Sequence, residues 1–323
     1  MKVILLALLT IISINSIAQI KNQDNLLQWL NRNAVSIKGN YPRKLTAYLD
    51  SNKVLGLGEA SHGTKEFFTE KNKIIEYLVE KGDYRQIGFE FTDVEIARIN
   101  EYVLGKNEDL RALMKDLRLY RTKEFYNLFE WIKSYNLKQT SQKVNVFGFH
   151  QIDFTDPLTR DSLMAENIIK RQKTVSQKMI IWGHNLHIGR YGADVLGATA
   201  MGKYLSNHYL GHYFNISFDT YEGDVNTLKI NEEGNYSFEQ HQLEMPIENF
   251  SALFSKCAKP NFFVYMRRDN PFSGNENTIS NIYADWRAPF VLPVKFDDYF
   301  DALIFVRRTS ASEVLIYSNS IDN

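Results

Sequence analysis

The sequence predicts an α/β fold with a central parallel or mixed sheet flanked by helices on both faces. Over the first two-thirds of the chain, short runs rich in valine, isoleucine and phenylalanine alternate with longer amphipathic stretches. Continuous apolar runs are typical of strands buried on both faces, and their alternation with helices is typical of parallel sheets. The last third is richer in strand-like segments, so we expect a mixed sheet.

The N-terminus has the pattern of a secretory signal peptide at residues 1–18. Lys2 precedes an apolar stretch that runs from Val3 to Ile14, and small residues follow up to Ala18. A basic start, a short apolar core and small residues before the cleavage point define such signals. We expect cleavage after Ala18 and a periplasmic or secreted protein. The apolar stretch is shorter than the roughly 20 residues that cross a bilayer, so we expect no stable membrane insertion after cleavage.

Residues 19–323 are expected to form a single domain. The chain is 44% hydrophobic, which is enough for one packed core, and its only cysteine, Cys257, cannot form an intrachain disulfide. The 38 basic and 38 acidic residues cancel. A nucleic acid or an anionic membrane usually requires a basic surface, so the expected partner is a small molecule.

Four apolar runs each end in glycine, with an ionisable residue one or two positions later. They cover residues 54–59, 87–90, 146–150 and 180–184, and the ionisable residues are Glu59, Glu90, His150 and His184. Because the carboxyl ends of parallel strands meet at one edge of a sheet, these side chains should converge there. One such junction is an ordinary end of a strand, but four together indicate an active site.

Amphipathic patterns predict helices between these strands. Apolar residues recur at intervals of three and four in segments 25–34, 41–49, 64–80, 94–104, 110–117, 123–135 and 159–171.

In the last third we expect five strands and a hairpin turn at residues 231–234. The expected strands cover residues 213–218, 225–230, 262–266, 302–306 and 314–317.

The densest motif is Gly58-Glu-Ala-Ser-His-Gly-Thr64. A glutamate three residues before a histidine, at a turn from strand to helix, can orient the imidazole or share its proton. Histidine accepts protons near neutral pH, so His62 is the best candidate for a general base. Ser61 lacks the Gly-x-Ser-x-Gly spacing of a nucleophile elbow, and its ordinary role is a hydroxyl in a turn or helix cap.

His184 and His187 lie three residues apart just after a strand, so both can reach one ligand. Together with Glu59 and His62 they are also of the types that bind zinc, iron or manganese. A spacing of three is common by chance, and His-Glu-x-x-His is absent. We therefore assign no metal and no other cofactor, and keep a metal site as an alternative.

These motifs together resemble the erythromycin esterase family, bacterial hydrolases that open macrolide lactones, with relatives of unassigned substrate. The resemblance rests on residues 58–64, 88–90, 160–167 and 184–187. It implies a single hydrolase domain with an open cleft, and a metal-independent hydrolysis in which His62 activates water. It also implies that Glu59, Glu90, His184 and His187 occupy the other active-site positions.

Two residues depart from the family's pattern. Lys71 stands where an active-site arginine is usual, and His150 stands where relatives often have aspartate. A lysine keeps the charge of arginine but loses its bidentate geometry. We assign Lys71, His150 and Arg160 to substrate binding.

The expected function is therefore hydrolysis of an ester or lactone, such as a macrolide antibiotic, by a histidine-activated water. Glu59 would orient His62, Glu90 would position the water, and His184 with His187 would stabilise the oxyanion or protonate the leaving group. Two alternatives stay open. One is a metal-dependent hydrolase that uses the same residues, and the other is a non-catalytic protein that binds a ligand in the cell envelope.

Overall fold

The computed structural model describes residues 22–317 except residues 40, 50, 152, 268 and 269. The expected signal peptide at 1–18 lies outside this part of the chain. Within it, no helix has both the length and the apolar character that a membrane span requires.

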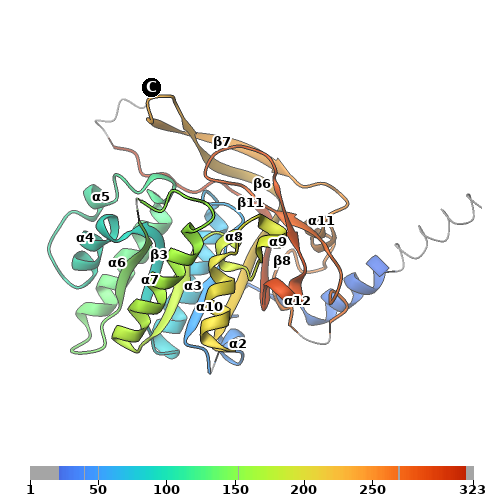
Figure 1. The fold of residues 1–323 in the computed structure, drawn as a ribbon, viewed down its shortest axis with the longest axis horizontal. Coiled ribbons are helices and arrows are strands. Elements are labelled where there is room, and N and C mark those ends of the chain that lie inside the picture. Colours follow the sequence, from blue (N-terminus) through green and yellow to red (C-terminus); the bar gives the residue numbers. More distant parts are fainter. Residues whose placement is uncertain (1–21, 40, 50, 152, 268–269, 318–323) are drawn as a thin grey trace, which may run out of the picture.

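A nine-stranded mixed sheet forms the centre of the molecule, in the order β1-β8-β11-β6-β2-β5-β3-β4, with β7 paired to β6 (Figure 1). A separate two-stranded sheet pairs β9 with β10. The strands are β1 (Val35–Ser36), β2 (Val54–Leu57), β3 (Tyr84–Thr92), β4 (Asn145–His150), β5 (Lys178–Trp182), β6 (Tyr213–Ile230), β7 (Tyr236–Glu244), β8 (Asn261–Tyr265), β9 (Asn277–Ser280), β10 (Val291–Val294) and β11 (Ala302–Thr309).

Helices cover both faces of the sheet, as predicted. Residues 22–33 are helical, and the other helical segments are α2 (Pro42–Thr46), α3 (Lys65–Lys81), α4 (Asp93–Val103), α5 (Leu110–Leu113), η1 (Arg118–Tyr120), α6 (Lys123–Leu137), α7 (Arg160–Val175), α8 (Asn185–Ile188), α9 (Ala193–Leu196), α10 (Met201–Tyr209), α11 (Phe250–Ser255) and α12 (Phe296–Tyr299).

Successive residues of one strand point into different cores. Leu55 of β2 packs with α3, α4 and α6, whereas Val54 packs with α7 and α10. A third core joins the helix at 22–33 and α11 to the other side of β8 and β11. Because side chains alternate across a strand, each buried strand needs apolar residues at every position, which is the continuous pattern seen in the sequence.

The four strands predicted to end at one edge are parallel neighbours. β3 pairs with both β4 and β5, and β5 pairs with β2, in each case in parallel. Their carboxyl ends therefore lie along the same edge. The sheet becomes mixed at its other side, because β8, β1 and β7 run antiparallel to their neighbours.

In the last third, two predicted strands merge, one does not form, and the observed strands β7, β9 and β10 were not predicted. Segments 213–218 and 225–230 are one strand, β6, of 18 residues. Its polar centre stays in the sheet because Asp219 is buried and accepts hydrogen bonds from Ser251 and Ser280. Segment 314–317 is not a strand; Val314 makes only an isolated bridge to the loop before α6.

The hairpin turn at 231–234 is confirmed, and it joins β6 to β7. The sequence did not predict β7, whose side chains are mostly polar and partly exposed and so lack an apolar pattern. In Figure 1 this hairpin extends across the top of the view, beyond the rest of the sheet. The predicted helix at 110–117 ends early, at Leu113.

Candidate active site

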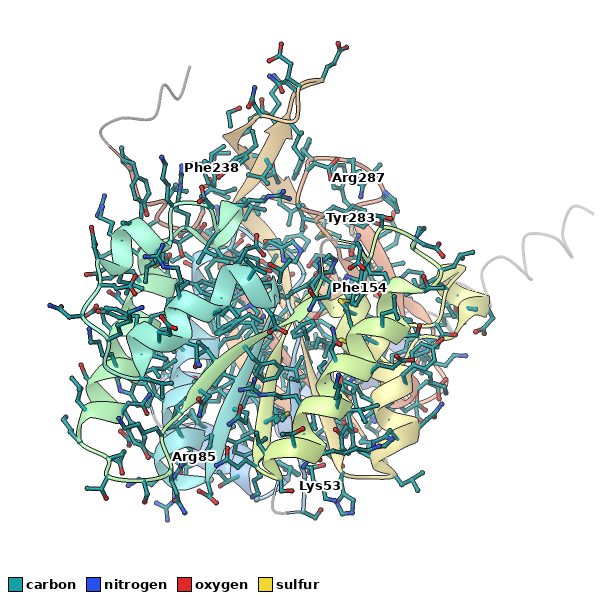
Figure 2. All side chains as sticks on the ribbon, turned by 60° about the vertical axis from the view of Figure 1, so that its left-hand side comes forward. Lys53, Arg85, Phe154, Phe238, Tyr283 and Arg287 are labelled. Atoms are coloured by element: carbon teal, nitrogen blue, oxygen red, sulfur yellow. The ribbon has the colours of Figure 1, made fainter. Side chains whose placement is uncertain are left out.

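The candidate site lies at the carboxyl edge of the parallel strands. In Figure 2, Lys53 and Arg85 mark the opposite edge, at the start of β2 and β3, while Phe154 and Tyr283 lie toward the carboxyl edge. Close packing shapes the turn after β2. A Cβ atom on Gly63 would lie 1.9 Å from the carbonyl oxygen of Asn226, so only glycine fits there.

Glu59 is the centre of the site and is fully buried. Its Oε1 lies 2.7 Å from Nδ1 of His62 and accepts a hydrogen bond from the Tyr120 hydroxyl at 2.9 Å. Its Oε2 accepts hydrogen bonds from Lys71 Nζ at 2.7 Å and from Trp182 Nε1 at 2.9 Å. Burial alone would raise the pKa of Glu59, but Lys71 and His62 lower it below its usual value. Glu59 is therefore a carboxylate surrounded by four donors.

These contacts fix the orientation of His62. Because the Tyr120 hydroxyl gives its proton to Glu59, its oxygen, 2.6 Å from Nδ1 of His62, can only accept. Nδ1 therefore carries the proton and donates to both Glu59 and Tyr120. Among the described residues, nothing hydrogen-bonds to Nε2 of His62, and the side chain is 13% exposed. Nε2 is thus a basic nitrogen with a free lone pair, as a general base requires.

Lys71 lies next to Glu59, in the interior of the protein, and has no exposed side-chain surface. Its ammonium contacts Glu59 and lies 4.3 Å from the centroid of the Trp182 ring. Burial lowers the pKa of Lys71 to about 8 against the opposing effect of Glu59. The substrate-binding role assigned to Lys71 stays a prediction, and in this position Lys71 would act on a substrate through Glu59.

His184 packs beside His62, with ring centroids 5.0 Å apart. Its Nδ1 accepts the Leu186 amide at 3.3 Å, and its Nε2 lies 3.2 Å from the Ile282 carbonyl oxygen, to which it donates. Burial lowers the pKa of His184 to about 3. His184 is therefore neutral, and both of its ring nitrogens are engaged by the backbone. Its predicted role toward an oxyanion or leaving group would need one of these bonds to open.

His187 lies between two carboxylates. Its Nδ1 is 2.9 Å from both oxygens of Asp161, and its Nε2 is 3.3 Å from Oε1 of Glu90 and 3.1 Å from Nη2 of Arg160. A guanidinium only donates, so the Arg160 contact requires a bare Nε2, whereas the Glu90 contact requires a protonated one. Burial alone would lower the pKa of His187, but Asp161 and Glu90 raise it to about 10. We therefore assign a proton to both nitrogens.

Glu90 connects the two histidines that follow β5. Its Oε2 accepts the backbone amide of His184 at 3.0 Å. Burial alone would raise the pKa of Glu90, but His187 and His62 hold it well below its usual value. Glu90 is thus a second carboxylate at the same edge.

The other two residues assigned to substrate binding lie further out. His150 ends β4 and is half-buried, with its ring centroid 5.8 Å from that of Phe154, and burial lowers its pKa. Arg160 begins α7 with its side chain 38% exposed. All eight predicted site residues therefore lie at or beneath this edge, and their individual roles stay predictions.

Several residues of the site were not predicted from the sequence. Asp161 lies inside the 160–167 motif and Trp182 ends β5, so the local sequence pattern could have identified both as residues of the site. No sequence pattern indicated that Tyr120 or Tyr283 belongs to the site. Tyr283 stacks on His184, with the rings 6.5 Å apart and inclined by 10°, and the Arg287 guanidinium lies 4.6 Å from the Tyr283 ring centroid (Figure 2).

The metal alternative has no preformed ligand set in the described part of the chain. No group of three or more histidine, cysteine, aspartate or glutamate side chains there is arranged to hold a metal ion. Both ring nitrogens of His184 face backbone groups instead.

Fold and site together define an α/β protein with a buried carboxylate and histidine pair at the carboxyl edge of its sheet. A profile of the erythromycin esterase family matches residues 79–154 and 150–309. The chain therefore belongs to the erythromycin esterase family, as the sequence motifs indicated.

Two curated relatives from Escherichia coli are similar to part of the chain. It is 26% identical over 128 residues to Erythromycin esterase type II, and 26% identical over 124 residues to Erythromycin esterase type I. Each match spans 38% of this chain and 30% of the relative. The chain therefore matches less than a third of the length of these relatives.

Solved structures share the fold. A protein from Bacillus cereus superposes with a TM-score of 0.79 at 20% identity, and a succinoglycan biosynthesis protein with 0.80 at 17%; both matches cover 91% of this chain and 99% of the other. A mutant of the erythromycin esterase EreC in its open conformation gives a TM-score of 0.65 at 15% identity, covering 87% of this chain and 95% of the other.

Proposed function

We propose that this protein hydrolyses a carboxylic ester or lactone by attack of a water molecule that His62 deprotonates. The observation that carries the proposal is the geometry of His62. Glu59 and Tyr120 hold its Nδ1, and its Nε2 remains free at the carboxyl edge of the sheet. Membership of the erythromycin esterase family supports the same reaction class.

The contacts supply each proton transfer that the reaction needs. Nε2 of His62 takes a proton as the water oxygen bonds to the carbonyl carbon, and Glu59 stabilises the resulting imidazolium. When the bond from carbon to the leaving oxygen breaks, the imidazolium returns the proton to that oxygen. A protonated His187 would place a fixed positive charge near the developing oxyanion.

The charges around the site favour a neutral substrate. Three carboxylates face three cationic groups, so the site adds no net charge at neutral pH; the groups are Glu59, Glu90 and Asp161 against Lys71, His187 and Arg160. An ester or lactone is neutral and gains charge only as it reacts, so fixed dipoles and paired charges can favour the transition state. Macrolide lactones belong to this class, and relatives are named for one of them.

A panel of aryl esters, aliphatic esters and macrolide lactones tests the proposal. Mass spectrometry of each product should show the addition of one water, and rapid mixing should show no acyl-enzyme. Hydrolysis of at least one ester or lactone by the wild type, lost in a His62 variant, is the expected result. A protein that binds panel members without turning over any of them would favour the non-catalytic alternative.

Chelation separates this mechanism from a metal-dependent one. Because His62 and Glu59 provide the base without a metal, prolonged treatment with a chelator should leave the hydrolysis rate unchanged. Elemental analysis of the active protein is the matching measurement. Activity that disappears on chelation and returns with zinc or manganese would replace the proposed mechanism by metal-activated water.

We further propose that the chain is exported and that the mature form begins at Gln19. The support is the signal pattern of residues 1–18. N-terminal sequencing of protein recovered from the periplasm or medium should begin at Gln19. A chain that keeps Met1 and sediments with the membranes would contradict this proposal.

A further inference from the structure

We infer that Asp161 is a positioning residue that keeps the imidazole of His187 protonated on both nitrogens. His187 then serves as a fixed positive charge, with its two N–H groups donated to Asp161 and Glu90, and not as a second base beside His62. The consequence for catalysis rests on the function proposed above, whereas the protonation state of His187 does not.

Two helix N-termini hold Asp161 in place as an anion. It lies in the first turn of α7, and its Oδ2 accepts the backbone amide of Met201, the first residue of α10, at 2.8 Å. Amides at the start of a helix lack a partner within the helix and favour negative charge. Burial alone would raise the pKa of Asp161, but His187 and the Met201 amide lower it below its usual value. Asp161 is therefore a carboxylate that cannot easily turn away.

This anchored carboxylate determines which way the ring of His187 points. With Nδ1 2.9 Å from both oxygens of Asp161, Nε2 is directed to the opposite side, where Oε1 of Glu90 lies at 3.3 Å. Glu90 is itself fixed by the backbone amide of His184. A neutral imidazole has one N–H, so the lone pair of its other ring nitrogen would face a buried carboxylate. A doubly protonated ring satisfies both carboxylates, and this is the arrangement that we assign.

The charges around His187 come from four elements. The titratable and charged groups that face it are Asp161 and Arg160 from α7, Glu90 from β3, His150 from β4 and His184 from the end of β5. The two carboxylates favour the cation, Arg160 opposes it, and His184 is neutral. In the competing arrangement Arg160 donates to a bare Nε2 of His187. Arg160 is partly exposed and can move away, whereas the two carboxylates are anchored by the backbone.

The wild-type protein provides the first test, and it needs no substrate. In protein labelled with ¹⁵N-histidine, correlation spectra distinguish the doubly protonated ring from each neutral tautomer. The His187 signals are assigned with His187→Gln. We expect wild-type His187 to remain doubly protonated from pH about 6 to about 9. A neutral ring near pH 8 would overturn the inference, without any need for a variant at Asp161.

Asp161→Asn provides the second test. The loss of a paired charge within a few ångströms should lower the pH at which His187 titrates by about 1 to 3 units. The matched control is Glu166→Gln, the same change at an exposed position of α7, which should leave the titration unchanged. An unchanged titration in a folded Asp161→Asn protein would show that Asp161 does not set the charge of His187.

Kinetics then separates this inference from the proposed function. With an ester that the wild type hydrolyses, Asp161→Asn should lower kcat with little change in KM, and it should move the alkaline limb of the rate profile to lower pH. A purely structural role would leave that limb in place and so contradict the catalytic part. If the wild type hydrolyses no ester, the proposed function fails while the titration still decides the protonation of His187.

Discussion

Replacing His62 by alanine is expected to lower the rate of ester hydrolysis by about a hundredfold or more while the protein stays folded. The imidazole provides the only free basic nitrogen among the three histidines that meet around Glu59 and Glu90. Loss of a general base typically costs about 10² to 10⁴ in rate. Steady-state kinetics with circular dichroism measures both parts of this expectation.

Ser61→Ala is the matched control for His62. Ser61 is buried, and its Oγ lies 2.5 Å from Oγ1 of Thr64, so its hydroxyl belongs to the turn before α3. We expect near wild-type turnover from this variant. A folded His62→Ala protein with unimpaired turnover would falsify the proposed mechanism. A Ser61→Ala protein that binds substrate but does not react would indicate a serine nucleophile instead.

Glu59→Gln is expected to have the second large effect, on rate and on stability together. Each carboxylate oxygen of Glu59 faces two donors, whereas a glutamine side chain has only one oxygen that can accept hydrogen bonds. An amide directed at His62 would donate to Nδ1, move the ring proton to Nε2 and so remove the base. Amide substitution in a comparable histidine and carboxylate pair costs about 10⁴ in kcat, through the wrong tautomer. A loss of this order in kcat is the expected result.

The stability of Glu59→Gln depends on Lys71. If the glutamine turned its NH₂ group toward Lys71, the buried ammonium of Lys71 would have no anion beside it. Breaking a buried ion pair in this way typically costs about 3 to 5 kcal/mol. The double variant Glu59→Gln, Lys71→Met removes the unpaired charge. Denaturant unfolding should therefore show the double variant to be more stable than Glu59→Gln alone, while its activity stays low. A double variant that regains wild-type activity would show that Glu59 does not control the tautomer of His62.

Local patterns predicted much of the parallel half of the fold. The apolar runs at 54–59, 87–90, 146–150 and 180–184 became β2, β3, β4 and β5, because strands buried on both faces require apolar residues throughout. The apolar patterns did not predict strands that depend on contacts with distant segments. The centre of β6 is polar, yet Ser251 and Ser280 satisfy its buried Asp219, and polar β7 forms because the turn at 231–234 brings it against β6.

Composition and spacing also predicted which ionisable residues meet. Parallel pairing places the ends of successive strands at one edge, so the position of a residue after its strand was sufficient to bring Glu59, Glu90, His150 and His184 to that edge. The spacing from Glu59 to His62 likewise predicted their contact, because three residues at a tight turn allow few other arrangements.

The sequence by itself therefore determined the parallel half of the sheet, its carboxyl edge and the eight ionisable residues predicted to gather there. Only the tertiary structure decided what each of them can do. Tyr120 reaches Glu59 across 61 positions of sequence, and Ile282 reaches His184 across 98. Such contacts have no periodic signature, yet they set which nitrogen carries a proton and which remains free. Protonation depends on burial and on the nearest charges, and both are properties of the packed chain and not of any local segment.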